Sequence, residues 1–110
     1  AEYHQAVCYY RAGSLSKADK AITRYLSSNP KSSSGRVLEG QIAQDRGNLG
    51  AAEQAFRAAI KIDKKNGSAW VLLGNVLRKM GDKTGAKEAY RQALRINPKD
   101  KIAKKNLKRL

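Results

Sequence analysis

The sequence predicts an all-α fold, a solenoid of about seven helices, and an internal repeat is the main observation behind this prediction. Gly13, Gly47 and Gly81 are separated by 34 residues. An alanine follows five residues after each glycine, and a large apolar residue follows four residues after each alanine. Pro30 and Pro98 lie 68 residues apart, twice the same period. Apolar residues within each unit recur at helical spacing, so each unit is predicted to form a pair of helices.

The third unit shows the expected elements most clearly. Ser68 is predicted to cap a helix that runs from residue 69 to residue 80. Gly81 is predicted to end this helix, because glycine adopts the left-handed cap conformation at low cost. A second helix follows and ends at Asn97-Pro98, since proline disfavours helical geometry in the residue before it. In chain order, the predicted helices cover residues 2–12, 16–28, 35–46, 50–62, 69–80, 84–96 and 100–110.

These elements predict a single domain over residues 1–110. Its repeats are expected at about residues 1–32, 33–66 and 67–100, and a capping helix is expected at residues 101–110. The chain has no Met at position 1, so it is expected to be part of a longer protein. No stretch approaches the ~18 uninterrupted apolar residues that a membrane-spanning helix requires.

The residue types at the repeated positions of the third unit match the pattern of one known protein family. The residues that carry it are Trp70, Leu73, Gly74, Leu77, Gly81, Ala86, Tyr90, Ala93 and Pro98. In these residues the unit resembles the tetratricopeptide repeat, and the resemblance extends over essentially the whole chain. It implies a right-handed α-α superhelix with a concave and a convex face. It also implies a non-catalytic module or scaffold that binds other proteins.

Small residues are expected where two helices of one unit approach closely. Gly40 and Gly74 occupy this position in the second and third units, and Ala6 occupies it in the first. The large apolar residues that lie four positions after each repeated alanine are expected to fill the gap between one unit and the following one. They are Ile22, Phe56 and Tyr90.

The second unit departs from the family pattern, with Arg36 and Glu39 where the family has Trp and Leu. Two interpretations of Glu39 follow. It is either a specificity residue, or a partly exposed carboxylate that pairs with Arg36 one turn earlier. The ion pair is the favoured interpretation.

The sequence does not predict an enzyme. Catalysis needs a nucleophile, an acid–base pair or a metal held at a defined spacing. His4 and Cys8 lie four residues apart, but two ligands do not make a metal site. The glycines lie at repeat turns and form no phosphate-binding loop. No cofactor is therefore expected.

The resemblance places a partner-binding groove on the first helix of each unit. The groove residues would be Tyr3, Val7 and Tyr10, then Val37, Leu38, Gln41 and Gln44, then Val71, Leu72, Asn75 and Arg78. Apolar side chains would supply affinity and amides would satisfy backbone groups, which suits an extended peptide or an amphipathic helix. In this interpretation Leu38 and Leu72 point away from the core. The alternative is that Val37 and Val71 only contact neighbouring helices.

Some members of the family grip the C-terminal carboxylates of chaperones with a clamp of Lys, Asn, Asn, Lys and Arg. Counted from the first unit, the corresponding residues are Tyr3, Val7, Leu38, Ser68 and Leu72. Counted from the second unit, they are Val37, Gln41, Leu72, Ile102 and Asn106. Neither set resembles the clamp, so binding of chaperone tails in that way is not expected.

The net charge of +14 comes from 23 Lys and Arg against 9 Asp and Glu. Residues 101–110 contribute five cations and no acid. Helical spacing places these cations on one face of the capping helix, opposite Ala103, Leu107 and Leu110. The cations are Lys101, Lys104, Lys105, Lys108 and Arg109.

Two roles for this basic patch remain open. It solubilises the end of the solenoid, or it makes the chain an adaptor that docks to an anionic surface. The expected partner is another protein, bound through a peptide or helical segment, and an acidic one would fit the charge. A membrane surface and a homo-oligomer remain alternatives. Nucleic acid is disfavoured, because only 6% of the residues are aromatic and available for stacking on bases.

Overall fold

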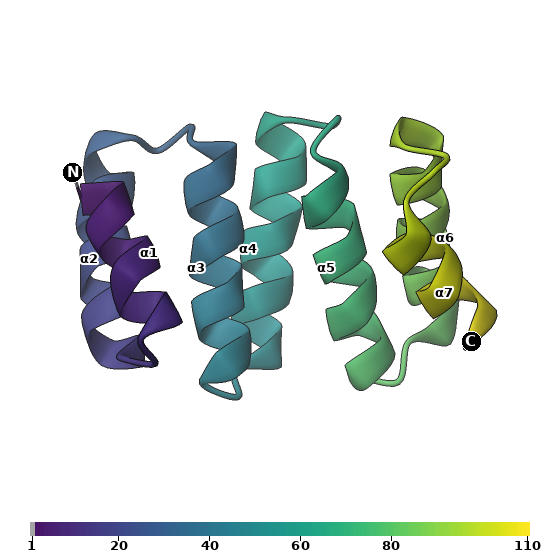
Figure 1. The fold of residues 1–110 in the computed structure, drawn as a ribbon, viewed down its shortest axis with the longest axis horizontal. Helices are drawn as coiled ribbons and strands as arrows, with labels where there is room; N and C mark the ends of the chain where they lie inside the picture. Colours follow the sequence, from purple (N-terminus) through teal and green to yellow (C-terminus); the bar gives the residue numbers. More distant parts are fainter. Residues whose placement is uncertain (1) are drawn as a thin grey trace.

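The computed structural model describes residues 2–110, and Ala1, the first residue of the predicted first repeat, lies outside the described residues. Seven helices follow one another along the long axis of this part of the chain, which measures 37 × 25 × 20 Å, with α1 in front of α2 and α7 in front of α6 (Figure 1). None of them is long and apolar enough to cross a membrane. They are α1 (Glu2–Arg11), α2 (Leu15–Ser28), α3 (Ser33–Asp45), α4 (Leu49–Ile62), α5 (Gly67–Lys79), α6 (Lys83–Ile96) and α7 (Lys101–Lys108).

The helices form three hairpins followed by a single helix. Helix α1 packs on α2, α3 on α4 and α5 on α6, and each hairpin packs on the next. The hairpin turns contain Gly13, Gly47 and Gly81, whose φ angles are 81°, 84° and 88°. These angles are left-handed, a conformation that glycine adopts without the Cβ clash of other residues. The structure confirms the predicted all-α solenoid.

Several helices begin earlier than the sequence pattern predicts. Ser68 was expected to cap α5, but Asn66 is the capping residue, and its Oδ1 accepts a hydrogen bond from the amide of Ala69 at 3.2 Å. Helix α3 begins at Ser33 instead of Gly35, because the hydroxyl of Ser32 accepts from the Gly35 amide at 3.0 Å. In both cases a polar residue before the apolar pattern satisfies an otherwise unpaired backbone amide.

Close contact between a glycine and an aromatic ring sets the spacing of the second and third hairpins. A Cβ added to Gly40 would lie 2.5 Å from Cε1 of Phe56, and one added to Gly74 would lie 2.6 Å from Cε1 of Tyr90. Both rings therefore contact the glycine of their own unit, and both belong to the core cluster that continues into the helices that follow. The first unit has Ala6 and the smaller Ile22 at the same columns, both fully buried.

Most of the buried apolar residues form two clusters. One joins the first hairpin to α3 through Leu38 and Ile42. The other extends from α4 to α7, where Ala103 is fully buried and Leu107 and Leu110 pack against it. This confirms the predicted apolar face of the last helix, although α7 ends at Lys108 and not at Leu110.

The ring-on-glycine contact predicts the effect of adding a methyl group. Gly40→Ala should lower the free energy of unfolding by about 1–3 kcal/mol, because the new Cβ overlaps Phe56. Phe56→Ile in the same chain should recover part of this loss, because the pair would then match Ala6 and Ile22. Urea unfolding followed by circular dichroism measures both effects.

Gly50→Ala provides the matched control. Gly50 lies in the first turn of α4, and the nearest atom to an added Cβ is 4.0 Å away. Because this site has room, the change should stabilise the protein by about 0.4–1 kcal/mol. If Gly40→Ala behaved like Gly50→Ala, the ring contact would not set the hairpin spacing.

Candidate functional site

The predicted groove residues lie on α1, α3 and α5, the first helix of each hairpin. In Figure 1, α1 stands in front of α2, and α7 stands in front of α6. Most of the groove side chains are half-buried, so each combines a fixed position with an accessible surface. They are Tyr3, Val7, Tyr10, Val37, Gln41, Gln44, Leu72, Asn75 and Arg78.

Leu38 and Val71 are the exceptions in this set. Leu38 is only 4% exposed and belongs to the core cluster between the first hairpin and α3, so the expectation that it points away from the core is wrong. Val71 is 8% exposed and belongs to the second cluster. Leu72 and Val37 pack on that second cluster while keeping part of their surface accessible. The accessible apolar surface of the groove is therefore smaller than the sequence suggested.

The N-terminal end of the predicted groove is aromatic. The ring of Tyr3 lies 5.3 Å from the ring of Tyr25 and 6.2 Å from the ring of His4, measured between centroids. Burial raises the pKa of the Tyr10 phenol above its ordinary value of 10.0, and the nearby Asp45 carboxylate raises this pKa further. Tyr10 therefore remains a neutral hydrogen-bond donor and acceptor at physiological pH.

The centre of the groove carries two amide side chains, Gln41 and Gln44, one turn apart on α3. Within residues 2–110, neither amide is hydrogen-bonded to another protein group. Each amide has both donors and acceptors. The two glutamines can therefore bond to the backbone of a segment laid across α3.

The C-terminal end of the groove contains a hydrogen-bonded cluster. Oδ1 of Asn75 accepts from the hydroxyl of Tyr90 at 2.5 Å and from Nδ2 of Asn106 at 3.0 Å. These bonds connect α5, α6 and α7. Burial raises the pKa of Tyr90, and the positive charge of Arg78 opposes part of this increase. The cluster fixes Asn75 at the groove surface, with Arg78 beside it.

The repeat pattern predicts Asn75 and Arg78 as groove residues but does not indicate the hydrogen bonds that Tyr90 and Asn106 make to Asn75. Tyr90 occupies a core column, and its ring is fully buried. Only the folded arrangement brings its hydroxyl to Asn75, which lies fifteen residues earlier in the chain. The pairing of Asn106 with Asn75 spans 31 residues, and no sequence signal indicates it.

The basic patch on α7 is accessible. Its five cations are all exposed, and none forms an ion pair with any residue that the structure describes. Those cations are Lys101, Lys104, Lys105, Lys108 and Arg109.

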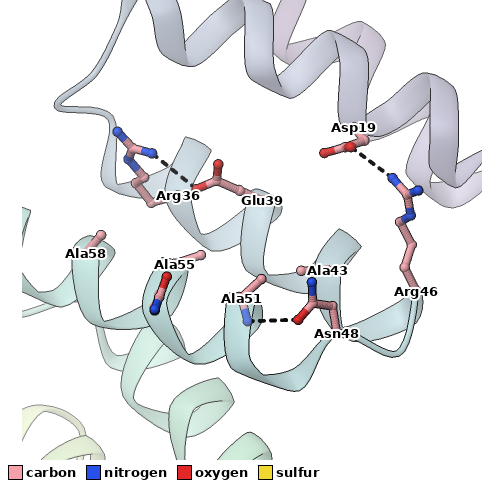
Figure 2. A pocket seen from close by; sticks show the side chains of 10 residues that line it. Asp19, Arg36, Glu39, Ala43, Arg46, Asn48, Ala51, Ala55 and Ala58 are labelled. Carbon is pink, nitrogen blue, oxygen red and sulfur yellow. Dashed lines mark hydrogen bonds and ion pairs between the residues drawn. The ribbon is translucent and has the colours of Figure 1, made fainter.

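Arg36 and Glu39 form the ion pair that was the favoured interpretation of Glu39. Nη1 of Arg36 lies 3.2 Å from Oε1 of Glu39, and both side chains are about one-third exposed. This pair lines a cleft together with residues of α2 and α4 (Figure 2). Neither Gln41 nor Gln44 lines this cleft. His4 and Cys8 are both exposed on α1.

Two sequence profiles, both described as tetratricopeptide repeat, match residues 37–101 and residues 1–32. The chain belongs to the tetratricopeptide repeat (TPR) family. No curated protein sequence matches the chain.

Solved TPR domains share the fold. The first TPR domain of Spaghetti (RPAP3), bound to an HSP90 peptide, has a TM-score of 0.95 at 16% identity, covering 98% of this chain and 86% of that chain. The TPR domain of Arabidopsis OM64 has a TM-score of 0.93 at 24% identity, covering 98% and 89%. The Sgt2 TPR domain from Aspergillus fumigatus also scores 0.93 at 24% identity, covering 98% and 73%.

A longer enzyme contains a similar TPR segment. A mutant O-GlcNAc transferase from Thermobaculum terrenum has a TM-score of 0.89 at 27% identity, covering 96% of this chain but only 20% of the transferase chain. The likeness lies in one segment of that protein, in keeping with the general use of TPR domains as non-catalytic interaction modules.

The raised pKa of Tyr90 predicts a loss of stability at alkaline pH. The folded state holds the phenol proton more tightly than the unfolded state, so this contribution is complete below the ordinary pKa of 10.0 and is lost as pH rises above it. Tyr90→Phe should therefore flatten the fall in the free energy of unfolding above about pH 10.

Urea unfolding from about pH 8 to pH 11 measures the difference between wild type and variant. Tyr3→Phe is the control, because it removes a phenol hydroxyl outside the Asn75 cluster. Equal slopes for wild type and Tyr90→Phe would contradict the assignment.

Proposed function

We propose that this chain is a non-catalytic module, folded as one domain over residues 1–110, that binds a segment of a partner protein in its concave groove. The main support for this proposal is the pair of glutamines on α3, Gln41 and Gln44. Their side-chain amides form no hydrogen bond to any other residue that the structure describes. Half-buried apolar side chains belong to the same predicted surface, namely Val37 on α3 and Leu72 on α5. Such a surface fits a peptide backbone that carries apolar side chains at intervals.

The two ends of the groove differ in chemistry, which favours one orientation of a bound segment. Tyr3 and Tyr10 at the N-terminal end offer flat apolar surface and neutral hydroxyls. Asn75 and Arg78 at the C-terminal end offer an amide and a positive charge. A segment with an apolar residue at one end and an acidic residue at the other satisfies both ends.

Two of the structurally similar TPR domains support a protein segment as the class of ligand. One is bound to an HSP90 peptide and another, the second TPR domain of human RPAP3, is in complex with an HSP70 peptide. The positions that form the family's carboxylate clamp hold Tyr3, Val7 and Leu72 in this chain, among others. We therefore propose binding of an internal segment instead of a chaperone C-terminus.

Peptide selection tests the groove. Random twelve-residue peptides would be displayed on phage, selected on the full chain, and measured individually by isothermal titration calorimetry. Gln41→Ala combined with Gln44→Ala should weaken the selected peptides by about tenfold or more, because two hydrogen bonds to the ligand are lost.

Gln5→Ala, an exposed amide on α1 outside the groove, should leave the affinity unchanged. Leu38→Asp is not a suitable groove variant, because it would place a carboxylate in the core. Peptides that bind the double glutamine variant as tightly as wild type would contradict the groove proposal.

A second candidate function rests on the basic patch of α7. Its five exposed cations lack ion-pair partners among residues 2–110, so their field is available to an acidic segment of a partner protein. An acidic polypeptide is favoured over nucleic acid, because α7 has no aromatic side chain on which a base could stack.

Binding of poly-glutamate tests this second function. Replacing Lys104, Lys105 and Lys108 with Gln should weaken binding more than tenfold at low salt, and the wild-type affinity should fall steeply as salt is raised. The matched control replaces Lys17, Lys20 and Arg24, three exposed cations of α2. If both triple variants lost the same affinity, or if vesicles with anionic lipids bound tighter than poly-glutamate, the acidic-protein assignment would be wrong.

A further inference from the structure

A cleft of about 670 Å³ is lined by residues of α2, α3 and α4 (Figure 2), and none of the predicted groove residues lines it. Its lining includes four alanine side chains from α3 and α4: Ala43, Ala51, Ala55 and Ala58. Two ion pairs stand at its rim. Arg36 pairs with Glu39 along α3, and Arg46 reaches Asp19 on α2 at 2.9 Å.

The internal repeat explains why this space is open. Thirty-four residues further along the chain, the positions of Arg36, Glu39 and Ala43 are occupied by Trp70, Leu73 and Leu77. In the third unit these side chains pack on the core, where Leu73 is 1% exposed and Leu77 is 4% exposed. The second unit has two charged residues and a methyl group instead. The cleft is the volume that these replacements leave.

The core is interrupted at the same place. The buried apolar residues of α2 belong to one cluster, and Ala52 and Phe56 of α4 belong to the other. The cleft lies between these two helices. A domain of this size gains stability from a continuous core, and departures from the packing pattern are expected mainly at functional positions.

We propose that this cleft is a second binding site, and that it accepts an aromatic side chain of a partner polypeptide. The alanine methyls in its lining offer apolar surface to a ring. The guanidinium of Arg36, held by Glu39, can stack on the face of that ring. The next unit of the repeat has an indole at the position equivalent to Arg36, which supports an aromatic ring as the occupant of this space.

The charges of the rim select against ionic ligands. An anion near Arg36 or Arg46 would also meet Glu39 and Asp19, and a cation near the acids would meet the arginines. A neutral ring avoids both repulsions. The volume exceeds that of one side chain, so the flanking peptide backbone also fits, and the exposed amide of Gln54 at the rim can bond to it.

Nuclear magnetic resonance on the full chain with labelled alanine methyls tests the proposal. The probe is N-acetyl-tryptophan amide, titrated as a neutral indole attached to peptide groups. We expect saturable shifts at the methyls of Ala43, Ala51, Ala55 and Ala58. Ala58→Gln, which introduces the residue found at position 92, should weaken this binding by about tenfold.

A second variant blocks the site in another way. Glu39→Leu combined with Ala43→Leu reproduces Leu73 and Leu77, so it should abolish the saturable shifts and raise Tm by about 4–8 °C. Ala12→Gln, an exposed site outside the cleft, is the matched control and should retain binding. The double variant at Gln41 and Gln44 should also retain it, which separates this site from the groove.

Four results would overturn the proposal. They are the absence of saturable shifts in wild type, equal shifts in Ala58→Gln, equal shifts in the double leucine variant, and saturable shifts of the same methyls on titration with inorganic phosphate. The last result would assign the cleft to anions.

Discussion

The contact of an aromatic ring with a glycine on the facing helix, Phe56 with Gly40 and Tyr90 with Gly74, determines the spacing of two hairpins. Phe56 packs between α3 and α4, and Tyr90 packs between α5 and α6. The face of α3 or α5 that turns away from this ring is exposed to solvent. That face carries the groove residues on α3 and α5. The same contact brings the hydroxyl of Tyr90 to Asn75, which in turn holds Asn106 of α7. Packing inside a hairpin thus positions polar groups at the groove surface.

The distribution of charge follows from how the carboxylates are used. Asp63, Asp82 and Asp100 accept hydrogen bonds from backbone amides at turns and helix starts. Three other acids form ion pairs with arginine. Few acids therefore remain to neutralise cations, and α7 has none. The described surface therefore carries a cationic helix at one end and a cleft whose arginines are paired with acids, in addition to the amide side chains of the proposed groove.

The same repeat can carry all three surfaces because only a few positions in each unit are needed to hold its two helices together. The glycine turns and the small residues at the close approach keep their type in every unit. Positions between these columns vary, as the replacement of Trp70 and Leu73 by Arg36 and Glu39 in the preceding unit shows. The hairpin tolerates this change because Phe56 and Gly40 still hold α3 against α4. Freed from packing, Arg36 and Glu39 line an open space.

The sequence by itself determined the helical solenoid, its 34-residue period, the turn glycines and the apolar face of the last helix. These properties depend on local spacing and backbone conformation, which a linear pattern records. It also indicated the pair of Arg36 and Glu39, since the two lie one helical turn apart. Only the tertiary structure decided that Leu38 is buried, that Asn75 meets Tyr90 and Asn106, and that a cleft opens between α2 and α4. These outcomes depend on how neighbouring helices pack. Contacts between residues that are distant in the chain cannot be inferred from the spacing of residue types in a single sequence.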